Sequence, residues 1–200
     1  LLVWPESSYI PLGHVYGKRS NVFAVGVGDS GRLALYKDLG EAGFHWSLGP
    51  DVRPLSPTLR AVSASREDRV VGVGDACSAL HFDGKRARAI EVQCVGDASE
   101  PASLLGVAVG APTGQRPEMD GHRTLVLAVG EYGGLYRGDL EGLRPVPSGV
   151  SSHLRAVALL DSKRALAVGD DGVVLAIDGA QVSRLPRLEA RRLNDVSVDA

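Results

Sequence analysis

The stretch Val168-Gly169-Asp170-Asp171-Gly172 closes a short apolar run, and three earlier stretches of the chain follow the same pattern. The earlier copies are Val27-Gly28-Asp29-Ser30-Gly31, Val73-Gly74-Asp75-Ala76-Cys77 and Val129-Gly130-Glu131-Tyr132-Gly133. Each copy joins Val-Gly to an acidic residue, and three of the four place Gly two residues after the acid. A pattern that returns at such long intervals predicts a fold built from repeated units.

A second pattern, Leu-x-x-Val, recurs in step with the first. Its successive starts lie 47, 45, 50 and 39 residues apart, at Leu12, Leu59, Leu104, Leu154 and Leu193. Periods of about 40 to 50 residues are typical of β-propeller blades. Helical repeats of similar length need an apolar residue about every 3.6 positions, and that pattern is missing here.

Each unit is predicted to hold four short strands. In the fourth unit the expected strands are Arg155–Leu160, Arg164–Val168, Val173–Ile177 and Ala180–Leu185. Asp178-Gly179 is a strong signal for the tight hairpin between the last two. Second strands are continuously apolar, as expected when both faces are covered. Last strands alternate apolar and polar residues, as expected when one face is in water.

These patterns predict an all-β chain with the architecture of a β-propeller. Residues 1–200 are expected to form a single propeller segment, with four complete four-stranded blades at about 9–50, 56–97, 102–147 and 152–188. Partial blades are expected at 1–5 and 190–200, with Arg192–Val198 as the innermost strand of a following blade. Propellers hold four to eight blades, so a longer propeller with about two to four more blades is favoured over a small closed ring of four.

On these marks the chain resembles bacterial β-propellers with a degenerate Val-Gly-Asp-x-Gly blade motif. It is similar to the photosystem II assembly-factor-like and sialidase-repeat-like propellers, and more distantly to quinoprotein-type propellers. The Ser-x-Asp-x-Gly-x-x-Trp box of sialidase-type blades and the Trp-Asp pairs of WD40 blades are absent from the sequence. The resemblance therefore implies a blade architecture and carries no activity across, because propellers host many unrelated functions.

The bulk composition excludes little. The net charge of −2 gives no general attraction to nucleic acid, and with aromatic residues at 5% the chain lacks the stacking side chains of single-strand binders. No run approaches the roughly 20 apolar residues of a membrane-spanning helix. The five histidines show no ligand spacing, so neither a metal site nor a cofactor is expected. The sequence does not indicate a compartment.

The acidic residues of the repeated turns are expected to form an arc on one face of the propeller; they are Asp29, Asp75, Glu131 and Asp170. A functional interpretation is recognition of a cation or a basic partner. A structural interpretation is favoured, in which each acid accepts backbone N–H groups of its own turn while Gly supplies a positive φ. One acid per blade does not supply the six to eight oxygens of a calcium site.

The loops between first and second strands each carry a pair of basic residues, on the face opposite the acids. They are Lys18 and Arg19, Arg66 and Arg69, Arg116 and Arg123, and Lys163 and Arg164. Such a face is a candidate binding surface for an acidic partner. The alternative is that these are solvated hairpin tips. The third loop is longer, within Pro112–Arg123, and is either a functional loop or tolerated length.

Three further sets of residues are candidates for a functional or structural role. Arg60 and Arg155 sit in identical Leu-Arg-Ala-Val segments and are expected either at the mouth of a central channel or in a packing role common to the repeats. Cys77 and Cys94 are either paired, which needs an oxidising compartment, or, as the sequence favours, two separate thiols. His81 is expected to be a surface or rim histidine.

The sequence favours a non-catalytic recognition or scaffold module that binds a protein partner of unknown identity. The alternative is a hydrolase- or lyase-type enzyme with a site in the central channel, which would need convergent acids and arginines on the innermost strands. A third possibility is a purely structural spacer. No Gly-x-Ser-x-Gly elbow and no phosphate-binding glycine loop is present.

Overall fold

The computed structural model describes residues 58–66, 68–95, 101–110, 124–189 and 191–198 in full. Before them it describes the strands 12–18, 23–28, 32–38 and 44–51 by their backbone alone. These residues form an all-β fold whose single helical turn is the 3₁₀ segment Glu131–Gly133.

Four sheets, here called sheets 1 to 4, follow one another along the chain, and in each four strands pair antiparallel in sequence order. Sheet 3 also takes in a fifth strand, β9 (Glu91–Val92), which pairs in parallel at its outer edge. Sheet 1 holds β1 (Leu12–Lys18), β2 (Phe23–Gly28), β3 (Arg32–Asp38) and β4 (Phe44–Asp51). Sheet 2 holds β5 (Leu59–Arg66), β6 (Arg69–Gly74), β7 (Ala79–Phe82) and β8 (Ala87–Ala89). Sheet 3 holds β10 (Leu104–Val109), β11 (Val126–Gly130), β12 (Leu135–Gly138) and β13 (Gly142–Pro145). Sheet 4 holds β14 (Leu154–Leu159), β15 (Arg164–Gly169), β16 (Val174–Asp178) and β17 (Gln181–Arg184).

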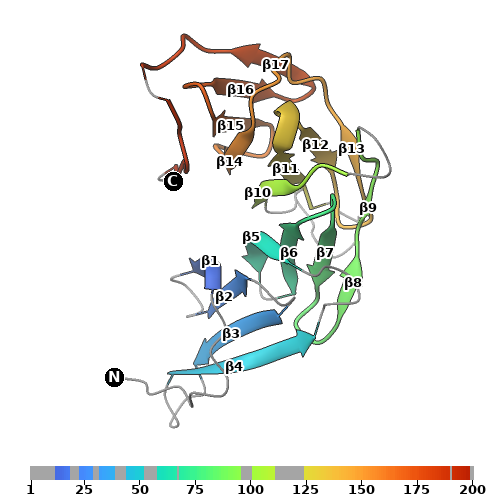
Figure 1. Ribbon diagram of the computed structural model, residues 1–200. Coiled ribbons are helices and arrows are strands. Elements are labelled where there is room, and N and C mark those ends of the chain that lie inside the picture. Colours follow the sequence, from blue (N-terminus) through green and yellow to red (C-terminus); the bar gives the residue numbers. More distant parts are fainter. Residues whose placement is uncertain are drawn as a thin grey trace.

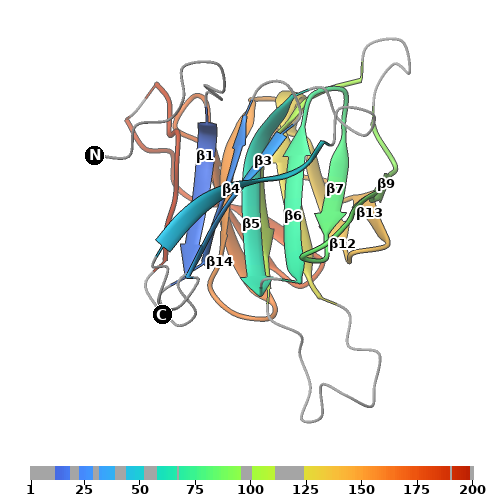
Figure 2. The same ribbon diagram turned by 90° about the horizontal axis from the view of Figure 1, so that it is seen from below.

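The sheets are fanned in an arc. Figure 1 shows the first strands, β1, β5, β10 and β14, on the concave side of the arc, and the last strands on the convex side. Neighbouring first strands touch, since β5 contacts both β1 and β10, and β10 contacts β14. Figure 2 shows β5, β6 and β7 of sheet 2 side by side along their length. In sheet 4 each strand begins and ends within one residue of the sequence expectation.

The core lies between the faces of adjacent sheets. Val71 and Val73 of sheet 2 pack with Val126 and Tyr136 of sheet 3 in one buried cluster. The opposite face of sheet 3 packs on sheet 4 in a second cluster, built from residues such as Leu127, Leu135, Ala167, Leu175 and Ile177. Full burial of one such Leu or Val side chain contributes about 1.5–3 kcal/mol. Stability therefore comes from contacts between sheets more than from any one sheet.

The expected gradient from inner to outer strands is confirmed. The second strands β6 and β11 are buried at nearly every position, because sheets cover both of their faces. The last strands β13 and β17 are mostly exposed. The alternation of residues in the last strands reflects this half-exposed position.

The two glycines of the repeated turn are needed for different structural reasons. The Gly of Val-Gly lies against backbone, since a Cβ at Gly74 would be 1.9 Å from Thr58 O and one at Gly169 would be 2.0 Å from His153 O. The later Gly supplies a positive φ, as the sequence predicted, with 65° at Gly172. In sheet 2 the equivalent residue is Cys77, which adopts a φ of 57° without being Gly.

Cys77 and Cys94 form a disulfide with a Cα–Cα distance of 6.3 Å, so the preference for two separate thiols is wrong. In the sequence Ile90, Val92 and Cys94 alternate with polar residues, which predicts one continuous last strand. Instead β8 ends at Ala89, and the next strand, β9 (Glu91–Val92), leaves sheet 2 and pairs in parallel with β13 of sheet 3. This crossing brings Cys94 to the β6–β7 turn, where its sulfur also lies 3.9 Å from Cys77 O.

The segment after sheet 4 forms no strand within 191–198. A single bridge joins Arg192 to Asp170, and Leu193 N–H donates to Gly169 O. An innermost strand takes its hydrogen bonds from the second strand of its own sheet, and the described residues hold no such partner for 191–198. The segment lies against the β15–β16 turn of sheet 4 instead.

Candidate functional site

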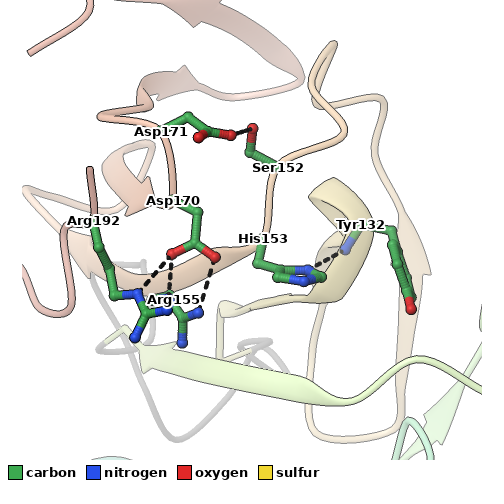
Figure 3. Close-up of polar contacts among 7 residues, drawn as sticks. All are labelled: Tyr132, Ser152, His153, Arg155, Asp170, Asp171 and Arg192. Carbon is green, nitrogen blue, oxygen red and sulfur yellow. Dashed lines mark hydrogen bonds and ion pairs between the residues drawn. The ribbon is translucent and has the colours of Figure 1, made fainter. Parts of the chain in front are cut away.

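The acid of the sheet 4 turn is bound by the first arginine of the same sheet. Arg155 follows the first residue of β14, and Asp170 follows β15, where Leu154 pairs with Gly169. Arg155 Nε donates to Asp170 Oδ1 at 2.6 Å and Nη2 donates to Oδ2 at 2.9 Å, as Figure 3 shows. This is the paired geometry in which a guanidinium and a carboxylate bind most strongly. The two side chains are 25% and 20% exposed.

A second arginine joins this pair from the segment after sheet 4. Arg192 Nε lies 3.2 Å from Asp170 Oδ1. The hydrogen bonds from Arg155, then the charges of Arg155 and Arg192, hold the pKa of Asp170 below its ordinary value against the opposing effect of burial. The same contact with Asp170 raises the pKa of Arg155. The carboxylate is thus held ionised by two cations.

Sheet 2 repeats the contact and sheet 3 replaces it. Arg60 donates to both oxygens of Asp75, with Nη2 to Oδ2 at 3.2 Å, across the same separation of 15 residues. This pair is more exposed, at 47% and 30%. In sheet 3 the arginine position holds Leu105, and Glu131 Oε2 instead accepts the N–H of Ser103 at 2.8 Å. Asp29 of sheet 1 lies outside the described residues.

The acidic arc and the channel-mouth arginines are therefore one set of contacts in sheets 2 and 4. Sequence analysis placed them apart and assigned the acids to backbone N–H groups of their own turns. The turns close without them, through main-chain bonds such as Gly74 N–H to Ser78 O and Gly169 N–H to Val173 O. The equal separation of 15 residues in Arg60–Asp75 and Arg155–Asp170 was the available signal.

An aromatic residue that the sequence analysis did not single out lies near the same turn. Tyr132 is 72% exposed, and its ring meets that of His153 edge-on at 5.2 Å. The Tyr132 N–H donates to His153 Nδ1 at 3.0 Å, while Ser152 Oγ donates to Asp171 Oδ2 at 2.8 Å. Figure 3 shows that Ser152 and His153 point to different partners. The arrangement is not that of a Ser-His-Asp triad, in which the imidazole receives the serine proton.

The basic loops are only partly free to present charge. Arg164 Nε pairs with Asp161 Oδ2 at 2.6 Å, and Arg66 Nε lies 3.3 Å from Asp68 Oδ1. The backbone N–H groups of Arg164 and Lys163, then the Arg164 guanidinium, lower the pKa of Asp161 to about 2. Within the described ranges the Lys163 side chain makes no hydrogen bond or ion pair. Of the other residues of this set, Arg69 lines a cavity described below and Lys18 has only its backbone described. Arg19, Arg116 and Arg123 lie outside the described residues.

His81 is buried, contrary to the expectation of a surface histidine. It is 9% exposed, and its Nε2 lies 2.9 Å from Asp68 O. Sheet 3 covers this face of β7, which the alternation within one strand could not indicate. The long loop within Pro112–Arg123 lies outside the described residues.

Two cavities open beside the basic loops. The first, of about 740 Å³, lies where sheet 2 meets the β12–β13 hairpin and is lined by Arg69 among others. The second, of about 640 Å³, lies on sheet 4 and is lined by Arg164. Among the described residues no three His, Cys, Asp or Glu side chains gather in a way that would hold a metal ion. Among the same residues, no helix has the length and apolarity that crossing a bilayer requires.

The sequence matches no protein-family model and no curated protein. The fold is similar to a solved structure titled "YCF48 bound to D1 peptide", with 16% identity and a TM-score of 0.57. The match covers 94% of this chain and 56% of that one, so this chain spans little more than half the length of the protein it resembles. The likeness supports the distant propeller-like relationship that the repeated marks predicted.

Proposed function

We propose that this chain is a non-catalytic recognition module that binds a protein partner by a peptide segment, and that residues 1–200 form part of a propeller of more than four blades. The observation that carries the proposal is the likeness to a structure whose title names a bound peptide, which extends over nearly the whole of this chain. Rigid packing between sheets suits such a role, because it holds the loops in fixed positions at little cost in entropy on binding.

The binding surface proposed is the face of the first-to-second-strand loops. Lys163 and Arg69 are the described cations there without a carboxylate partner, whereas Arg164 and Arg66 are paired with Asp161 and Asp68. A surface with a few unpaired cations steers a partner of opposite charge and fixes its register. The paired arginines would contribute less, since a new partner must compete with their own aspartates.

Selection of displayed random dodecapeptides on the immobilised full chain tests the proposal. We expect a recurring acidic motif whose synthetic peptide binds at least tenfold more weakly when Lys163 and Arg164 are both changed to Glu. Thermal unfolding of this double variant, together with unchanged far-UV circular dichroism, serves as the control for folding. Failure of any motif to recur over repeated selections would overturn the proposed function. A motif whose peptide binds the double variant as tightly as the wild type would show that this face is not the binding surface.

A further inference from the structure

Arg69 and Arg164 occupy the same position in two sheets. Each is the first residue of the second strand, five residues before the Gly of Val-Gly. Each also lines a cavity at the same end of its sheet. Each also stands ten residues after the leucine that begins its sheet, Leu59 or Leu154, and Arg66 and Asp161 occupy the position three residues before it. The surroundings of Arg69 and Arg164 can therefore be compared directly, position by position.

The difference between the sites lies in that earlier residue. In sheet 4, Asp161 receives the backbone N–H groups of Lys163 and Arg164 and also binds the Arg164 guanidinium. In sheet 2, Arg66 stands in its place and binds Asp68 instead. Among the described residues the Arg69 side chain forms no ion pair, and its Nη1 is removed from solvent without a hydrogen-bond partner.

A buried guanidinium nitrogen without an acceptor is unusual, because the water it has lost is not replaced by any protein group. Nη1 itself is shielded from solvent, but the Arg69 side chain also lines the cavity of about 740 Å³, which gives an acceptor room beside the guanidinium. The other polar groups of the lining are partly committed. Arg137 Nη1 donates to Gly179 O in sheet 4, and Asp139 Oδ1 accepts the N–H groups of Glu141 and Gly142.

We propose that the cavity between sheet 2 and the β12–β13 hairpin is a binding site for a carboxylate of an acidic peptide segment, held by the Arg69 guanidinium. A carboxylate matches the planar fork of a guanidinium. Glu91 and Glu141 also line the cavity and repel any anion, a doubly charged phosphate more strongly than a singly charged carboxylate. Arg137 and Arg144 in the same lining offset part of this repulsion. That the carboxylate comes from a peptide rests on the proposed function; the anion site itself does not.

The site can be tested by NMR on the full chain labelled with ¹⁵N-arginine. The probe is acetyl-Gly-Glu-Gly-amide, and the readout is the Nε–Hε signal of Arg69, assigned with Arg69→Lys. We expect the Arg69 signal to shift to saturation at a concentration at least tenfold lower than any shift at Arg164. An Arg69 signal that shifts no more readily than that of Arg164 would overturn the site.

Two variants sharpen the test. Arg66→Asp rebuilds in sheet 2 the contact that Asp161 makes in sheet 4, so we expect it to weaken peptide binding at Arg69 at least tenfold. Arg164→Ala removes the paired arginine of the matched site and is expected to leave that binding within twofold. Undiminished binding in a folded Arg66→Asp variant contradicts the assignment, as does an equal loss in Arg164→Ala.

Three further probes identify the ligand chemistry. Acetyl-Gly-Gln-Gly-amide is expected not to shift the Arg69 signal, and inorganic phosphate is expected to bind more weakly than the Glu peptide; the opposite result for either overturns a carboxylate site. Sodium acetate is expected to bind at least fivefold more weakly than the peptide, and equal binding would assign the site to free carboxylates and overturn the peptide source. These titrations are independent of the peptide selection. A failed selection would therefore leave the anion site at Arg69 standing but not its peptide source, and a failed titration would leave the proposed function standing.

Discussion

Sheet 4 carries Asp161 three residues before Arg164, whereas sheet 2 carries Arg66 three residues before Arg69. The two sheets also differ in their arginine–aspartate contacts and in their cross-links. Sheet 4 gathers Arg155 and Arg192 on Asp170, while the corresponding Arg60–Asp75 pair of sheet 2 is more exposed. Sheet 2 instead has the disulfide between Cys77 and Cys94. Two repeats with one backbone plan therefore differ in how they are stabilised and in which charges remain available to a ligand.

The largest predicted effect comes from two glycine substitutions, which test whether sheets 2 and 4 share the same turn geometry. Gly169→Ala and Gly74→Ala each place a Cβ about 2 Å from a carbonyl oxygen, a clash that forces the first strand away from the turn. We expect each to cost about 3 kcal/mol or more in the free energy of unfolding. Urea denaturation measures both. Gly142→Ala is the control, since its nearest neighbour would be 3.5 Å away, and it should cost under about 1 kcal/mol.

If one substitution lowered the free energy of unfolding strongly and the other only slightly, the two turns would not share the same backbone geometry.

The second test removes the feature that only sheet 2 has. The double change Cys77→Ser and Cys94→Ser opens a loop closed across a sequence separation of 17 residues. Such a loop is expected to contribute about 3 kcal/mol. Unfolding of the variant and of the wild type in reductant should give the same lowered midpoint. Insensitivity of the wild type to reductant would argue that the thiols are not joined.

The third test compares the two arginine–aspartate pairs. Arg155→Ala removes a contact that is mostly shielded from solvent, and we expect a loss of about 1–2 kcal/mol. Arg60→Ala removes the equivalent but more exposed contact and should cost less than about 1 kcal/mol, because solvent screens exposed pairs. Denaturation at low and at high salt measures both. Equal losses would mean that exposure does not separate the two sheets.

The smallest effect is the dependence on pH. Contact with Arg155 lowers the pKa of Asp170 in the folded protein below its ordinary value of 3.8. The stabilisation is therefore fully present above about pH 4 and is lost as the pH falls through the folded pKa. The stability difference between wild type and Asp170→Asn should shrink between pH 5 and pH 2 in urea titrations. A difference that stays constant over this range would show that Asp170 does not titrate with folding.

The sequence by itself determined the all-β character, the strand order and the repeated turns. These follow from apolar periodicity and turn chemistry, which are local properties, so Asp178-Gly179 and Gly172 behaved as expected. It also picked out Arg60, Arg155 and the turn acids, and the equal separation of each pair was visible in it.

Only the tertiary structure decided which of these groups meet. Arg69 Nη1 is buried without an acceptor where sheet 2 meets the β12–β13 hairpin, and Cys94 reaches Cys77 because β9 crosses to sheet 3. His81 is buried because an adjacent sheet covers it. Such contacts depend on the packing of one sheet against the next, and the pattern within a single repeat carries no information about its neighbour.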